Sequence, residues 1–155
     1  MSSDPASVRT QYCFHGAYER KVDGKGRFNL PFRFRAGGGT AEDETYVVSP
    51  GTVGNLAVFP QDEWDETFRR MKSRSPEPQW QANVRKLSAQ SFKLVPDSQG
   101  RVSVPLALLK RAGIERRVTV VGMGQNMELW DPERFEAAQE ELPEVDPTFL
   151  NEFFV

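Results

Sequence analysis

Hydrophobic and polar positions change period several times along the chain, and each change predicts a boundary between elements. Residues 12–22 and 27–30 alternate unevenly around Lys25, which has a glycine on either side. This pattern predicts a β-hairpin with Lys25 at its tip and with positive φ in the turn. A second strand pair is predicted at 45–49 and 55–59, joined by a Pro-Gly turn.

Helical spacing replaces the alternation in the middle of the chain. From about Asp62, the large apolar residues Trp64, Phe68 and Met71 recur at i, i+4 and i+7. They predict a helix whose apolar stripe belongs to a core or an interface. A second helical pattern covers 79–90, and the polar, proline-containing run 73–78 between them predicts a linker.

The order of elements then repeats. Strands are predicted at 92–95 and 101–104 as a second hairpin, then a helical turn from Pro105 closed by Gly113, then strands at 117–122 and 127–130.

The last helix has clear start signals. Asp131 is the predicted N-cap and Pro132 the first helical residue, and Phe135, Ala138 and Leu142 share one face.

A short motif occurs twice at one offset. Asp23, Gly26, Arg27 and Pro31 return as Asp97, Gly100, Arg101 and Pro105, each 74 residues later. The spacing is too long for a solenoid unit and too short for two ordinary domains, so it predicts two small interlocked modules. We divide the chain into a flexible arm (1–12), a first module (13–72), a linker and connecting helix (73–90), a second module (91–142) and an apolar tail (143–155).

Composition is that of a folded protein of one cooperative unit, because 38% of the 155 residues are hydrophobic and 27% are charged. No apolar run reaches the roughly 20 residues needed to span a membrane, and the N-terminus is polar. These features predict a cytoplasmic protein without a membrane partner.

Charge is distributed unevenly along a chain whose net charge is only −2. The segments 18–35 and 101–117, which contain the two motifs, each carry +4, whereas 131–152 carries −7. Such asymmetry can focus a local field while the total stays near zero. Charge alone supports a nucleic-acid contact and ordinary solvated faces equally.

Candidate catalytic chemistry is sparse. With one cysteine and one histidine, Cys13 and His15, the chain offers no disulfide, no metal cluster and no arranged catalytic set. We interpret Cys13 as a buried strand residue; a reactive Cys13/His15 pair is the weaker alternative. The sequence therefore predicts no enzyme activity, no metal and no cofactor.

The duplicated motif resembles the MraZ family of bacterial transcription regulators, whose two tandem SpoVT/AbrB-type modules each carry Asp-x-x-x-Arg. The matching residues are 23–27 with Leu30-Pro31, 97–101 with Val104-Pro105, and the run 127–131. The resemblance implies an α+β, mainly β fold, in which two swapped-hairpin (AbrB-like) modules form a pseudo-symmetric β-barrel with short flanking helices. It also implies a ring-like homo-oligomer that binds promoter repeats of the division and cell-wall gene cluster, and so a nucleoid-associated protein.

Site residues follow from the motif and its charge. We expect Asp23, Gly26, Asp97 and Gly100 to shape the turns, with each carboxylate holding its arginine or capping turn amides. Arginine presents a planar donor fork suited to phosphates or a guanine edge. The candidate DNA-binding residues are Lys25, Arg27, Arg20, Lys21, Arg33, Arg35 and Arg101.

A different function class stays open. A protein-interaction module of AbrB-like fold, such as an antitoxin-like partner, would use the acidic C-terminal region and the apolar tail. A soluble monomer rarely exposes such a patch, so we favour a contact of this tail with another subunit over docking on its own fold.

Overall fold

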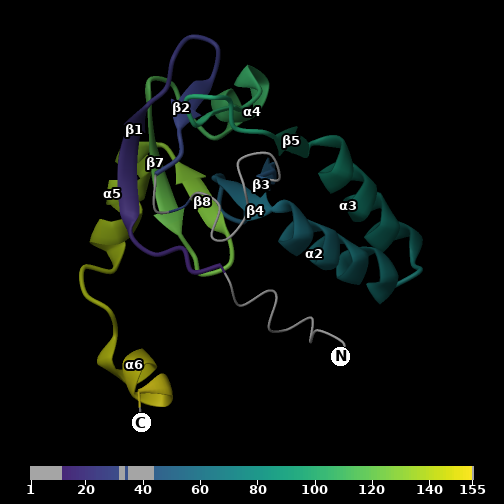
Figure 1. Ribbon diagram of the computed structural model, residues 1–155. Helices are drawn as coiled ribbons and strands as arrows, with labels where there is room; N and C mark the ends of the chain where they lie inside the picture. The colour runs from purple at the N-terminus through teal and green to yellow at the C-terminus, as the bar shows by residue number, and fades with distance from the viewer. Residues whose placement is uncertain (1–11, 32–33, 35–43, 155) are drawn as a thin grey trace, which may run out of the picture.

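A computed structural model describes residues 12–31, 34 and 44–154 of the chain (Figure 1). It contains strands and helices in nearly the predicted order. The elements are β1 (Ala17–Lys21), β2 (Arg27–Asn29), β3 (Tyr46–Pro50), β4 (Leu56–Pro60), α2 (Gln61–Arg74), α3 (Pro78–Ala89), β5 (Phe92–Leu94), β6 (Arg101–Ser103), α4 (Leu106–Arg111), β7 (Arg117–Gly122), β8 (Met127–Trp130), α5 (Pro132–Glu141) and α6 (Pro147–Phe153).

The strands form antiparallel pairs, which confirms the α+β, mainly β class. Six of them make one sheet in the order β1-β7-β8-β4-β3-β5, and β2 pairs with β6 in a separate ribbon. No closed barrel is detected among the described strands, because β1 and β5 are the edges of the large sheet. The order is symmetric about the β8–β4 pair, so each strand of one half has a counterpart in the other.

The two hairpins predicted around the motifs are wrong, whereas the strand pair predicted at 45–49 and 55–59 is confirmed as β3 and β4. The strands on either side of each motif do not pair with each other: β1 pairs with β7, β5 with β3, and β2 with β6. The tight turns themselves are present, since the Asp23 amide donates to the Arg27 carbonyl at 3.0 Å. The strands pair between halves rather than within each motif because pairing of β2 with β6 buries apolar side chains of both halves in one core.

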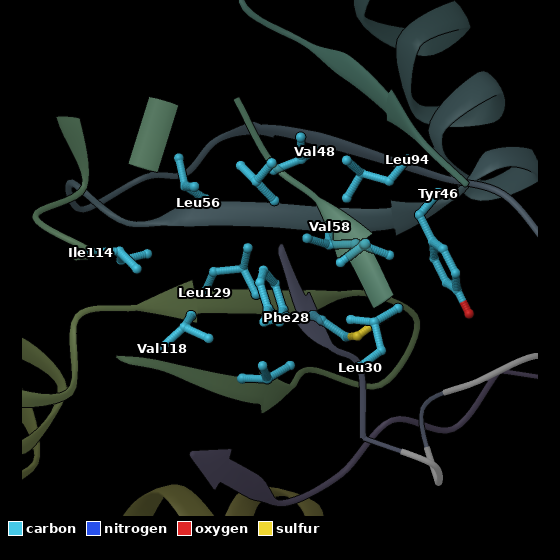
Figure 2. Close-up of a cluster of buried hydrophobic side chains, with 14 of the residues drawn as sticks. Phe28, Leu30, Tyr46, Val48, Leu56, Val58, Leu94, Ile114, Val118 and Leu129 are labelled. Atoms are coloured by element: carbon cyan, nitrogen blue, oxygen red, sulfur yellow. The ribbon is translucent and has the colours of Figure 1, made fainter. Parts of the chain in front are cut away.

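The core lies where the ribbon meets the large sheet. Phe28 stands opposite Val102 in the β2–β6 register, and both are buried. Figure 2 shows Phe28 and Leu30 among side chains of the large sheet, including Val58 and Leu129. Alternation on three-residue strands therefore directs one face of the ribbon inward and leaves the other for solvent.

The helices of the first half pack as a pair. The Trp80 indole on α3 donates to the Met71 carbonyl on α2 at 2.6 Å. Trp64 and Phe68 are half-buried with ring centroids 6.0 Å apart, as the apolar stripe predicts. The predicted linker 73–78 is too long, because α2 continues to Arg74 and only three residues separate it from α3.

Three predictions near the chain ends have different outcomes. Asp131 is the N-cap of α5 as predicted, because its side chain accepts from the Arg134 amide at 3.2 Å. Cys13 is exposed rather than buried in a strand, since β1 begins only at Ala17. Leu142 is exposed rather than packed, because α5 ends at Glu141. The predicted arm lies outside the described residues except for Tyr12.

Candidate nucleic-acid interface

The two motif turns have the same hydrogen-bond network. Asp23 Oδ1 accepts from the amides of Lys25 and Arg27, both at 2.9 Å, and Oδ2 accepts from Arg27 Nε at 2.8 Å. Asp97 repeats this with the amides of residues 99 and 101 at 2.9 Å and with Arg101 Nε at 2.9 Å. Each carboxylate thus caps its turn and holds its arginine, as the four-residue spacing predicts.

These bonds lower the pKa of both aspartates. For Asp23 the largest cause is the Arg27 amide; the Arg27 side chain and the Lys25 amide add to it, and partial desolvation opposes it. The pKa of Asp97 is lowered by the Arg101 amide first and otherwise by the same causes. Both carboxylates are therefore ionised at neutral pH, and each arginine keeps its partner there.

Glycine is required at only one of the two positions beside Lys25. Gly26 has φ +80°, and a Cβ there would lie 2.3 Å from the Val104 carbonyl oxygen. Gly24 does not have positive φ, and a Cβ there would meet no atom within 4 Å, so the turn itself does not require glycine at that position. Gly100 repeats the φ of +80° in the second turn.

The ribbon brings both arginines to one solvent face. Phe28 and Val102 point into the core, so their neighbours Arg27, Asn29, Arg101 and Ser103 occupy the opposite face. The side chains of Arg27 and Arg101 are 33% and 30% exposed. They are diagonal neighbours across the ribbon, a separation of roughly 7–8 Å or somewhat less between Cβ atoms in antiparallel pairs.

The guanidinium groups are oriented but not fully used. Only Nε of each arginine bonds to an aspartate; within the described part of the chain, the terminal Nη atoms of Arg27 and Arg101 have no hydrogen-bond partner. Lys25 is exposed at the first turn, and Gln99 holds the same place in the second. The face therefore presents the Nη donors of two guanidinium groups whose positions are held by the aspartates, which suits contacts with phosphate or base edges.

Of the other candidate residues, Arg20 and Lys21 are not part of this group. Arg20 lies on β1, where its guanidinium is 5.6 Å from the centre of the Tyr18 ring and donates to the Glu19 carbonyl. Lys21 is exposed beside the first turn and stands opposite Arg117 in the β1–β7 register. Arg33 and Arg35 lie outside the described residues.

Sequence reasoning missed the polar residues that complete the face. The Asn29 amide donates to the Gln99 carbonyl at 2.8 Å, which ties the end of β2 to the second turn. Ser103 Oγ lies 3.5 Å from the Lys25 carbonyl oxygen at the other end of the ribbon. The alternation around Phe28 could have placed Asn29 outward, but nothing local indicated that β6 lies beside it.

Among the described residues, no group of three or more His, Cys, Asp and Glu side chains could hold a metal ion. The described helices include none that is both long enough and apolar enough to cross a membrane.

Comparison with known proteins gives consistent matches over most of the chain. The family model described as "MraZ protein, putative antitoxin-like" matches residues 13–86 and again residues 87–148. A protein of Kineococcus radiotolerans is 36% identical over 140 residues, covering 89% of this chain and 92% of its own length. One of Corynebacterium diphtheriae is 33% identical over 148 residues, covering 90% and 99%. Both are named "Transcriptional regulator MraZ".

Proposed function

The chain belongs to the MraZ family, and from that membership we propose that it is a transcriptional regulator that binds double-stranded DNA through the exposed face of the β2–β6 ribbon. The observation that carries this proposal is the pair of aspartate-held arginines, Arg27 and Arg101, presented side by side on that face. The names of the relatives support regulation of transcription, and regulators of this kind are generally not enzymes.

The shape of the ribbon suits a duplex. The major groove of B-DNA, about 12 Å wide, admits a two-stranded β-ribbon. Arg27 and Arg101 are placed to reach phosphates or guanine edges from the two strands, and Lys25 adds a flexible cation at the first turn. Gln99 replaces this lysine in the second turn, so the two ends of the ribbon contribute unequally to phosphate binding.

The ribbon of one subunit carries few cationic side chains, so we expect assembly of several subunits to raise the affinity for DNA. A handful of phosphate contacts gives weak and salt-dependent binding, since each neutralised phosphate adds about −0.9 to the log–log salt slope. In a homo-oligomer every further engaged ribbon binds at high effective concentration, and tandem sites are then selected by their spacing. We therefore propose a ring-like oligomer acting on promoter repeats of the division and cell-wall cluster.

Two finer features belong to the same proposal. We take the halves to be swapped-hairpin modules, supported by the exchanged pairing of β1 with β7 and β5 with β3. We also place the protein in the cytoplasm at the nucleoid, where its DNA target lies. Arg20 and Lys21, which lie on β1, are assigned to a peripheral role outside the ribbon face, and Arg33 and Arg35 remain candidate DNA contacts.

The test is fluorescence anisotropy with DNA from the chain's own upstream promoter at two salt concentrations. Lys25→Ala with Arg27→Ala should weaken binding at least tenfold and flatten the salt slope by about two for each engaged subunit. Arg70→Ala with Lys86→Ala removes the same charge from exposed positions on α2 and α3 and should have little effect. Equal loss in both double variants would contradict a role for the ribbon.

An antitoxin-like interaction module is the second candidate. The description of the family contains that term, and the exposed apolar residues of the C-terminal segment favour a protein contact. If wild type binds no promoter DNA, or if binding survives Lys25→Ala with Arg27→Ala unchanged, this reading replaces the first.

A further inference from the structure

The C-terminal helix α6 exposes an aromatic face. Phe149, Phe153 and Phe154 are 55%, 69% and 78% exposed, and the rings of Phe149 and Phe153 lie 5.5 Å apart. Figure 1 shows α6 standing away from the sheets beyond the residues that follow α5. Contiguous aromatic surface of this kind marks a place where another surface binds.

The internal repeat identifies α6 as the counterpart of α3. Pro78 and Trp80 begin α3 after α2, and Pro147 and Phe149 begin α6 after α5. In the first half Trp80 packs back on α2, with its indole bonded to the Met71 carbonyl. The same fold-back on α5 would oppose like charges, because α5 carries four glutamates against Arg134 and α6 with its preceding segment adds Glu144, Asp146 and Glu152.

A surface of opposite charge lies on α2, α3 and β5. Two adjoining hollows of about 410 and 490 Å³ share Phe68 and Ser88. Their apolar lining includes Trp64, Val84 and Phe92, the last of which is 42% exposed. We call this surface the α2–α3 groove.

Basic side chains border the α2–α3 groove. Lys72 and Arg85 line one hollow and Lys93 lines the other, against a single carboxylate, Asp65. Among residues 12–31, 34 and 44–154, no ion pair engages any of these three cations. The groove thus combines exposed aromatic surface with unpaired positive charge, the complement of α6.

We propose that α6 of one copy of this chain docks in the α2–α3 groove of a second copy. Phe149 and Phe153 enter the hollows, and Glu144, Asp146 and Glu152 face Lys72, Arg85 and Lys93. The inference deepens the self-assembly in the proposed function by naming the two surfaces that join.

The occupant is a second copy because of where the two surfaces lie. Figure 1 shows α6 and the α2–α3 pair on opposite sides of the sheets. Only residues 142–146 connect α5 to α6, and five residues span at most about 18 Å. A contact between different surfaces of two copies is head to tail, so an open assembly keeps one free helix at one end and one free groove at the other until a ring closes.

A charge exchange tests the pairing. Sedimentation velocity of full-length variants should show self-association weakened about tenfold or more by Arg85→Glu, by Glu152→Lys and by Phe149→Ala with Phe153→Ala. Combining Arg85→Glu with Glu152→Lys should restore much of the loss. Lys86→Glu changes the adjacent, exposed residue of α3 outside the hollows and should leave association unchanged.

Disulfide trapping separates contacts within and between chains. In a Cys13→Ser background, one tagged chain carries Ser88→Cys and a differently tagged chain carries Phe153→Cys. A mixed covalent dimer under mild oxidation supports the proposal. No mixed dimer, or association unaltered by the groove and helix variants, overturns it.

The docking of α6 and the binding of DNA can be tested separately. If the docking is correct, Arg85→Glu weakens binding to tandem DNA sites but leaves affinity for a single site near that of wild type. Lys25→Ala with Arg27→Ala should have the opposite pattern: self-association stays intact while DNA binding is lost. Failure of the docking and failure of the DNA proposal are therefore distinguishable.

Discussion

Replacing Gly26 by alanine should destabilise the protein strongly, whereas the same change at Gly24 should not. The backbone of Gly26 has φ +80°, and its carbonyl accepts from the Val104 amide at 3.0 Å. A Cβ at this position would lie 2.3 Å from the Val104 carbonyl oxygen, which is backbone and cannot rotate away. Gly24 has neither restriction.

The size of the effect can be worked out from these contacts. Left-handed backbone costs an alanine about 1–2 kcal/mol. Forcing extra volume into a packed contact adds about 1–3 kcal/mol, so Gly26→Ala should lower the free energy of unfolding by roughly 2–5 kcal/mol. At about 2–4 °C per kcal/mol for a chain of this size, the Tm should fall by roughly 4–20 °C.

The assay is urea unfolding followed by circular dichroism, with wild type, Gly26→Ala and Gly24→Ala at one protein concentration, because association shifts apparent stability. Gly24→Ala should stay within about 1 kcal/mol of wild type. If Gly26→Ala unfolds within 0.5 kcal/mol of wild type (about the noise of a neutral surface change), the account of the turn as locked against β6 is refuted.

Three further changes test other parts of the structure. Because the pKa values of Asp23 and Asp97 are lowered, their ionised forms stabilise the fold above the unfolded pKa of about 3.9, and this contribution is lost as pH falls through the lower folded values. The urea midpoint of the wild type should therefore be constant between pH 6 and 8 and should fall below about pH 4. In Asp23→Asn this fall in acid should be less steep. Val102→Ala empties a fully buried site and should cost about 1–3 kcal/mol in chemical unfolding, while Ser103→Ala on the outer face should cost under about 0.5 kcal/mol. Asp131→Ala removes the N-cap of α5 and should cost about 1 kcal/mol, read from the loss of Tm, whereas Asp131→Asn should keep most of the cap.

Local chemistry was predictable where a short stretch of chain decides the structure. The start of α5 follows from Asp131 and Pro132 alone, because an N-cap needs only residues within one turn. The networks around Asp23 and Asp97 likewise close within five residues, and the four-residue spacing indicated them.

Partner choice was not predictable in the same way. Pairing of β2 with β6 joins residues far apart in the sequence, such as Phe28 and Val102, which are separated by 74 positions, and no local pattern distinguishes this from a hairpin. Cys13 was assigned to a strand because the uneven alternation begins several residues before the true start of β1 at Ala17. The helix α6 was missed although Asp146 and Pro147 give it the same start signals that Asp131 and Pro132 give α5; its seven residues are too few to show a helical period.

The pairing between halves governs the order in which the fold can form during synthesis. Arg27 of β2 leaves the ribosome 74 residues before Arg101 of β6, and at 5–20 residues per second this interval is roughly 4–15 s. During this interval β2 has an apolar face but no strand of its own chain to pair with. Neighbouring ribosomes on one messenger hold chains at successive stages of completion, so a finished β6 from a leading chain is the nearest competitor for that strand. Slower translation between the two motifs would therefore lengthen the time in which β2 can pair with a strand of another chain.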